Sequence, residues 1–91
     1  MSKNQTVTAK VEIDFKEGKR TIEMELKEPY EIENCEEGKA VIINLRNGET
    51  YTGIFKGMDG DEDIMIGSLS GKNIIGLKVN WIEDYFEQVG S

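Results

Sequence analysis

The stretch VIINLRNGETYTGIFKGMDGDEDIMI, residues 41–66, carries the pattern that decides the fold. An apolar residue or a glycine recurs at every second position on both sides of Asn47-Gly48, a dipeptide typical of a two-residue type I′ hairpin turn. Gly53 has no side chain to pack, so it predicts a bend, a bulge or a close backbone approach in mid-strand. The alternating positions are Val41, Ile43 and Leu45 before the turn and Tyr51, Gly53 and Phe55 after it. This pattern predicts a strongly bent antiparallel hairpin.

The residues before this stretch predict a second hairpin. Apolar residues alternate with polar ones from Val7 to Phe15 and again from Ile22 to Leu26, and Lys16–Lys19 supplies a turn that contains a glycine. Pro29 ends the second run, because proline cannot donate a hydrogen bond to the sheet. We interpret the acidic residues 30–38 as a short edge strand or a connector.

The residues after it predict further strands. We expect residues 57–61 to interrupt the ladder, residues 64–69 to resume it, and residues 70–73 to turn the chain again. Residues 74–79 and 81–86 are the last extended runs, although the irregular apolar spacing of 81–86 also fits a helical turn.

Short strands separated by glycine-marked turns predict an all-β protein, either a sandwich or a barrel. We favour a small, strongly bent antiparallel barrel, because a curled sheet buries one face and exposes fewer strand edges. The chain has room for one domain, residues 1–91, made of an N-terminal hairpin at 5–28 and a barrel at 39–86.

The composition excludes several classes of function. Eleven Lys and Arg stand against 18 Asp and Glu, for a net charge of −7, and neither half is basic, so we expect no binding to duplex DNA. No apolar run is long enough for a membrane helix, and the start of the chain has no apolar stretch like that of a secretory signal, so we expect a cytoplasmic protein that does not enter membranes.

The chain has no histidine and one cysteine, Cys35. Imidazole catalysis, Ser-His-Asp and Cys-His chemistry, zinc sites and an internal disulfide are therefore excluded within the chain. Acidic neighbours disfavour a thiolate at Cys35. We expect no enzyme, no cofactor and no metal site.

Two local patterns favour turns over ligand sites. Asp59-x-Asp61-x-Asp63 looks like the first half of a calcium loop, but the required glycine and bidentate glutamate are replaced by Ile64 and Ser70. Residues 67–73 have three residues between their glycines instead of the four of a phosphate loop. We interpret both as exposed turns between strands.

Residues 39–86 resemble the Sm and Sm-like (LSm) family. The spacing of its first motif is met by Ile43, Leu45, Gly48, Tyr51, Gly53, Phe55 and Asp59, and its second motif is approximated by Leu77-Lys78-Val79-Asn80. The resemblance implies a five-stranded barrel of the Sm-like or SH3-like kind. The alternating N-terminal hairpin departs from the short helix with which such proteins usually begin.

The resemblance also implies a homo-oligomeric ring, in which the fourth barrel strand of one subunit pairs with the fifth strand of the next. The two edges would lie at about 73–77 and 81–86, and pairing them would satisfy amides that a single barrel leaves open. The alternative is that the N-terminal hairpin covers these edges and the protein stays monomeric or dimeric. The expected interface residues are Ile74, Ile75, Leu77, Trp81, Tyr85 and Phe86.

Sm-like rings bind single-stranded RNA, and the resemblance implies such a ligand here. The corresponding positions depart from the family pattern, because Glu62 stands where a base would stack, Asp63 replaces an asparagine and Lys78 replaces an arginine. The expected RNA site consists of Asp59, Glu62, Asp63, Lys78 and Asn80. We therefore expect a non-enzymatic ring-forming protein that binds RNA, with a structural or protein-interaction module without nucleic-acid binding as the alternative.

Overall fold

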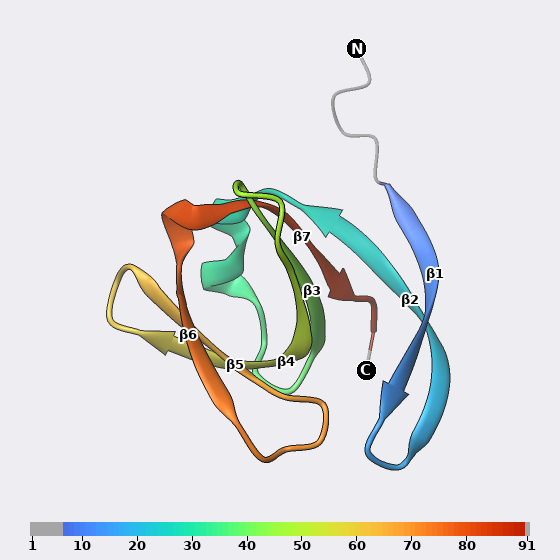
Figure 1. Ribbon diagram of the computed structural model, residues 1–91. Coiled ribbons are helices and arrows are strands. Elements are labelled where there is room, and N and C mark those ends of the chain that lie inside the picture. The colour runs from blue at the N-terminus through green and yellow to red at the C-terminus, as the bar shows by residue number, and fades with distance from the viewer. Residues whose placement is uncertain (1–6, 91) are drawn as a thin grey trace.

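The computed structural model describes residues 7–90, which form one antiparallel sheet of seven strands and two short 3₁₀ helices (Figure 1). The all-β prediction is confirmed. The strands lie in the order β1-β2-β7-β3-β4-β5-β6. The elements are β1 (Thr8–Phe15), β2 (Gly18–Lys27), η1 (Pro29–Asn34), β3 (Ala40–Leu45), β4 (Thr50–Asp59), β5 (Asp63–Gly67), β6 (Ile74–Lys78), η2 (Val79–Trp81) and β7 (Ile82–Gln88). Residues 5 and 6, which the sequence places in the first hairpin, lie outside the described residues.

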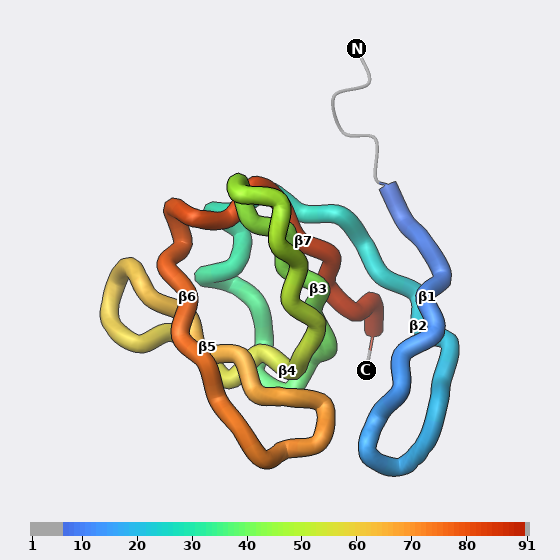
Figure 2. The backbone as a smooth tube through the Cα atoms, viewed as in Figure 1, coloured from blue at the N-terminus to red at the C-terminus, as the bar shows by residue number. Residues whose placement is uncertain are grey.

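Strands β7, β3, β4, β5 and β6 bend into a small barrel around the main core (Figure 2). Residues paired across two strands share a face of the sheet, so Ile43 and its partner Tyr85 both point into the barrel. The barrel core consists of Ile32, Cys35, Val41, Ile43, Leu45, Phe55, Ile64, Ile66, Leu77, Ile82 and Tyr85. The sheet does not close, because β6 pairs with β5 alone among the described strands.

A second core lies on the opposite face of the same sheet. Ile42 of β3 and Leu26 of β2 both pair with Phe86 of β7, and this face of the sheet points away from the barrel interior. The β1–β2 hairpin folds over the outer side of the barrel and buries Ile13, Met24 and Ala40 there, with Val11, Phe15, Ile22, Ile42, Ile54, Leu69 and Phe86 packed around them. Strand β3 is therefore covered on both faces.

The hairpin turn at Asn47-Gly48 differs from the predicted type I′ turn. A type I′ turn needs positive φ at both central residues, but only Gly48 has it, with φ of 95°. The Gly48 amide donates to the Leu45 carbonyl (3.0 Å), and the Leu45 amide donates to the Glu49 carbonyl (2.8 Å). These bonds form a type I turn followed by a glycine bulge, the common three-residue loop.

Glycines in β4 let the strand bend, as the sequence predicts for Gly53. A Cβ at Gly53 would lie 2.6 Å from Cγ2 of Ile66, so the strand passes too close to β5 for any side chain. Gly57 was expected to interrupt the ladder, but the register shifts by one residue between Phe55 and Gly57 and the strand continues to Asp59. A β-bulge with a glycine at φ of 111° therefore replaces the expected interruption.

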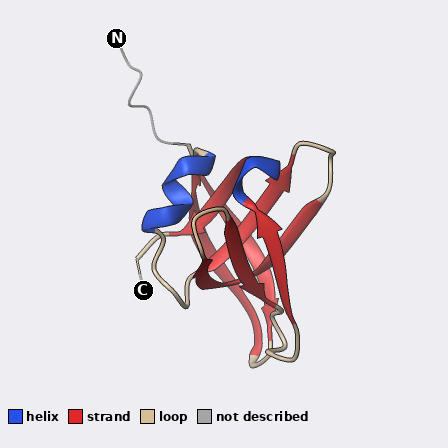
Figure 3. Ribbon diagram, turned by 90° about the vertical axis from the view of Figure 1, so that its left-hand side faces the viewer, coloured by secondary structure: helices blue, strands red, loops and turns tan. Residues whose placement is uncertain are grey.

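Two short 3₁₀ helices lie side by side at one end of the barrel (Figure 3). Pro29–Asn34 forms η1 instead of the strand or connector expected for residues 30–38. Pro29 fits the first position of a helix, and the Glu28 amide donates to Oε2 of Glu31 (2.9 Å), which holds the first turn. The buried Ile32 then covers the end of the barrel core. The strand expected at 81–86 is present as β7, preceded by the single turn of η2.

Candidate interaction surface

Strand β6 has one edge that no described strand pairs with. The Val79 amide donates to the Glu62 carbonyl (2.7 Å) and the Ser68 amide donates to the Asn73 carbonyl (2.8 Å), one at each end of the β5–β6 ladder. Hydrogen-bonded pairs alternate along an antiparallel ladder, so Ile75 and Leu77 bond to β5. The N–H and C=O groups of Ile74, Gly76 and Lys78 therefore point away from the sheet.

The sheet has a second outer edge, on β1, which differs from β6 in the charge of its side chains. The Leu26 amide donates to the Val7 carbonyl (2.8 Å), so the same alternation directs the backbone of Thr8, Lys10, Glu12 and Asp14 outward. All four side chains are exposed and three are charged. Charged side chains on an edge strand discourage pairing with another chain. Strand β6 has no such protection over Ile74–Leu77.

An apolar groove runs beside the free edge of β6. It consists of two neighbouring pockets that share Tyr51, one of about 310 Å³ next to Leu77 and Trp81 and one of about 240 Å³ next to Ile75. Trp81 is 48 % exposed and Ile75 is 38 % exposed, so apolar side chains reach solvent there. Exposed apolar surface beside unpaired backbone groups is typical of a binding site for an extended chain.

Contacts between the β3–β4 turn and η2 hold the groove in shape. The Arg46 amide donates to the Trp81 carbonyl (2.9 Å), and Arg46 Nε donates to the Asn80 carbonyl (3.1 Å). The Tyr51 hydroxyl donates to Oε1 of Glu49 (3.3 Å) on the same turn. The groove is thus built by residues from two parts of the chain, which join where β6 ends.

The residues expected to bind RNA lie at or near the β4–β5 turn. Carboxylates predominate among them, so this end of the sheet is acidic. Lys78 pairs with Asp63 across β5 and β6, and its Nζ lies 3.3 Å from Oδ1 of Asp63. Asp59 lies opposite Asp63 at the ends of β4 and β5, whereas Glu62 is exposed on the turn. Asn80 contributes its backbone carbonyl to the contact with Arg46. Lys78, the one cation among these five, is therefore already paired with a carboxylate.

The residues expected to form a subunit interface separate into two groups. Ile74, Ile75 and Trp81 are exposed along β6 and η2. Leu77 and Tyr85 belong to the barrel core, and Phe86 packs in the second core, so these three serve the interior of the chain. Part of the edge expected at 81–86 is already occupied within the chain, because β2 pairs with β7 from Met24↔Gln88 to Lys27↔Tyr85, whereas the edge expected at 73–77 is not covered by any described strand.

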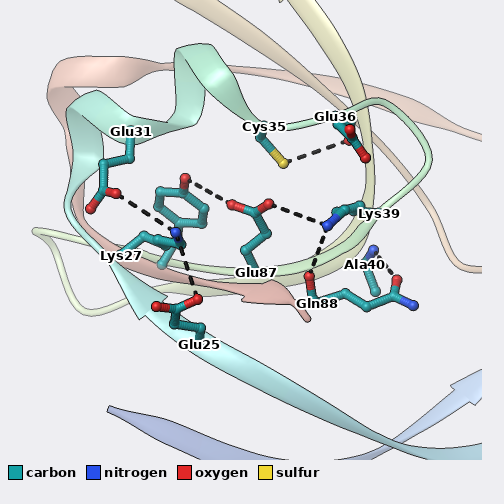
Figure 4. Close-up of polar contacts among 10 residues, drawn as sticks. Glu25, Lys27, Glu31, Cys35, Glu36, Lys39, Ala40, Glu87 and Gln88 are labelled. Carbon is teal, nitrogen blue, oxygen red and sulfur yellow. Dashed lines mark hydrogen bonds and ion pairs between the residues drawn. The ribbon is translucent and has the colours of Figure 1, made fainter. Parts of the chain in front are cut away.

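A polar cluster lies where β2, β7 and the start of β3 meet below η1 (Figure 4). The Glu87 carboxylate accepts from the Tyr85 hydroxyl (3.4 Å) and lies 3.8 Å from Lys39 Nζ, while Lys27 lies 3.7 Å from both Glu25 and Glu31. Gln88 Oε1 accepts from the Ala40 amide (3.0 Å) and so completes the start of β3. These contacts tie the ends of three strands together.

The same cluster contains Cys35 and Tyr85, the two groups between Val7 and Gly90 with strongly shifted pKa values. Burial, followed by the charge of Glu87, raises the pKa of the Cys35 thiol from 9.0 to about 12. The same two causes raise the pKa of the Tyr85 hydroxyl well above its usual range. Both groups stay protonated at neutral pH, so the cluster supplies neither a thiolate nor a phenolate.

Neither a metal site nor a membrane-spanning helix is present among the described residues. Within residues 7–90, no three Cys, Asp or Glu side chains are grouped so that they could hold a metal ion. None of the helices in the same residues is long and apolar enough to span a membrane.

No protein-family model matches the chain, and no curated protein or solved structure is significantly similar to it. The resemblance to Sm-like proteins therefore stays a prediction.

The sequence pointed to Ile74, Ile75 and Trp81 as contact residues of a subunit interface, but not to a groove beside them. Ile74 and Ile75 stand next to each other at the start of a strand, and Trp81 follows the same strand. Adjacent apolar residues on a strand point to opposite faces, so at an edge at least one of them remains in solvent. The contribution of Leu45 and Tyr51 depends on the bend of β4 and has no local signal.

Proposed function

We propose that the protein is a non-enzymatic protein-interaction module, which binds an extended segment of a partner protein as an additional strand on β6. The observation that carries this proposal is the free edge of β6 beside the apolar groove. The outward backbone groups of Ile74, Gly76 and Lys78 can pair with another strand, and alternate side chains of that strand would enter the groove. Backbone pairing supplies affinity and the pockets supply selectivity.

A ring with RNA at its centre has less support. The expected ring pairs the fourth barrel strand with the free edge of the fifth, but β2 already pairs with β7 at that edge. The residues expected to bind the RNA carry three carboxylates, an amine at Lys78 and an amide at Asn80, and Lys78 is paired with Asp63. Carboxylates repel the phosphates of RNA, whose neutralisation by cations supplies much of the affinity.

The proposal is tested by selecting peptides from a displayed library of extended sequences on the immobilised protein. We expect the selected peptides to bind the wild type and Gly76→Ala but not Gly76→Pro. Proline at position 76 removes an outward N–H that β5 does not use. Alanine keeps that N–H, and its Cβ would meet only the Ile64 carbonyl oxygen at 3.9 Å, an ordinary contact.

Nuclear magnetic resonance then locates the bound peptide. Slower hydrogen exchange at the amides of Ile74, Gly76 and Lys78, alternating with unchanged exchange at Ile75 and Leu77, is the signature of an added strand. Peptides that bind Gly76→Pro as well as the wild type would refute the proposal. Oligouridine that binds at low salt and shifts the resonances of Lys78 and Asn80, with no peptide selected, would favour the RNA-binding alternative.

A further inference from the structure

Strand β6 presents different chemistry on its two faces, and this difference determines which segments it can accept. Ile75 and Leu77 share the face that borders the groove, whereas Ile74, Gly76 and Lys78 share the outer face. An added strand alternates its side chains in the same way. Each face of β6 therefore selects every second residue of the partner segment.

The groove face selects apolar residues at a fixed spacing. One pocket lies next to Ile75 and the other next to Leu77, and these two residues are about 7 Å apart along the strand. The same spacing separates residues i and i+2 of any added strand. Leu45, Tyr51 and Trp81 supply most of the remaining apolar lining of the larger pocket. Two apolar side chains, two positions apart, would fill both pockets at once.

The outer face selects a negative charge. Residues 64–82 contain no Asp or Glu, in a chain that has 18 of them, and they contain Lys72 and Lys78. Lys72 is exposed and forms no ion pair with residues 7–90. Lys78 pairs with Asp63, but its side chain remains 47 % exposed and an ammonium group has three donors. Each end of the free edge thus has one ammonium group: Lys72 has no carboxylate partner among residues 7–90, whereas Lys78 shares its charge with Asp63.

This charge pattern also argues against a second copy of the chain as the occupant. If two β6 strands paired with each other in antiparallel register about Ile75, Lys72 of each would lie opposite Lys78 of the other, and like charges placed opposite each other destabilise a strand pair. A segment with acidic residues meets the edge with the opposite sign.

We infer that β6 binds an extended protein segment in which an acidic residue lies between two apolar ones, with the apolar side chains in the two pockets and the acidic side chain on the lysine face. This inference rests on the proposed function, because it specifies which strands the same edge accepts. The order of apolar, acidic and apolar residues in the segment can be varied in synthetic peptides.

Two synthetic peptides test the inference, one of alternating valine and glutamate and one of alternating valine and lysine. We expect fluorescence anisotropy to show tighter binding of the glutamate peptide to the wild type and to Gly76→Ala. Lys72→Glu should weaken that complex by roughly three- to ten-fold, the range of one or two exposed charge contacts, and should improve binding of the lysine peptide. Higher salt should reduce the difference between the two peptides.

The outcomes separate the inference from the proposed function. If both peptides bind equally and Lys72→Glu changes neither, the acidic preference is refuted while strand addition to β6 stands. If library selection yields edge-binding peptides without acidic residues, the inference falls in the same way. Absence of any peptide that protects the Ile74 and Gly76 amides refutes the proposed function itself. A wild-type oligomer that Gly76→Pro converts to a monomer would show that a second copy is the occupant, and would overturn the inference.

Discussion

Substitution of Gly53 by alanine tests the bend of β4, on which the barrel and the groove both depend. A Cβ at this position would lie 2.6 Å from Cγ2 of Ile66 and closer still to the carbonyl oxygen of Gly67. Ile66 is only 2 % exposed, and the Gly67 carbonyl belongs to the backbone of β5, so neither can move aside easily. Gly76→Ala is a matched control, because its nearest contact is 3.9 Å and Gly76 also lies in a strand.

The expected change in the free energy of unfolding of Gly53→Ala follows from two opposing effects. Replacing glycine by alanine restricts the unfolded chain and stabilises the fold by about 0.4–1 kcal/mol where the backbone accepts alanine. Forcing an extra carbon into a packed region costs about 1–3 kcal/mol, and the upper end applies when the neighbours are rigid. Gly53→Ala should therefore lower the free energy of unfolding by about 2 kcal/mol, which for a domain of this size lowers Tm by about 8–16 °C. Gly76→Ala should leave stability unchanged or raise it by up to about 1 kcal/mol.

Urea unfolding followed by far-ultraviolet circular dichroism measures both variants against the wild type. The comparison depends on the difference between two glycine-to-alanine changes, so the effect of alanine on the unfolded chain largely cancels. If the two variants agree within about 0.5 kcal/mol, β4 does not pass β5 as closely as the structure describes, and the reasoning about the bend is refuted.

Three further predictions concern the second core, the buried thiol and the state of assembly. Met24→Ala should lower the free energy of unfolding by about 2–5 kcal/mol because Met24 is fully buried, and equal effects for Met24→Ala and the half-buried Met65→Ala in urea unfolding would contradict a docked hairpin. Burial raises the pKa of Cys35 from 9.0 to about 12, so the folded protein keeps a proton that the unfolded chain releases, and stability should fall as pH rises through this range. Cys35→Ala should reduce that fall in unfolding free energies measured at neutral pH and near pH 10, and an unchanged pH dependence would show that the thiol is not the cause. Light scattering should give the mass of a monomer, since β2 covers β7, whereas a ring-sized mass would show that this cover opens.

The alternating strands and the glycines of β4 could be predicted from the sequence because their signals are local. Val41, Ile43 and Leu45 face the barrel as their alternation indicates, and Gly53 marks a close approach of two strands. The turn at Asn47-Gly48 was assigned the wrong type, because a type I turn with a glycine bulge accepts the same dipeptide.

The second core could not be predicted from alternation alone. Ile42 lies between Val41 and Ile43, and a run of three apolar residues is typical of a strand that is buried on both faces. Alternation assigns Val41 and Ile43 to the buried face and leaves Ile42 on the opposite face without a predicted partner. Which element covers the second face depends on contacts between residues far apart in the chain, since Met24 and Ala40 meet only after the hairpin folds back.

The candidate interaction surface could likewise be predicted only in part from the sequence. Ile74, Ile75 and Trp81 are exposed, and their expected role in a subunit interface stays a prediction. The sequence could not show that the neighbouring edge of β7 is taken by β2, because strand order is a property of the whole sheet. It also gave no sign that Tyr51 and Leu45 join the groove.

The N-terminal hairpin pairs with β7 and so limits how many strands of other chains the sheet can accept. A barrel with two receptive edges can accept a neighbour on each side and so build a closed circle or an endless fibre. Here one flank is occupied by the chain's own hairpin, whose outermost strand carries Lys10, Glu12 and Asp14, and the other flank remains receptive. We therefore expect such a molecule to accept one added strand, at β6, and so to end a stack of strands without extending it.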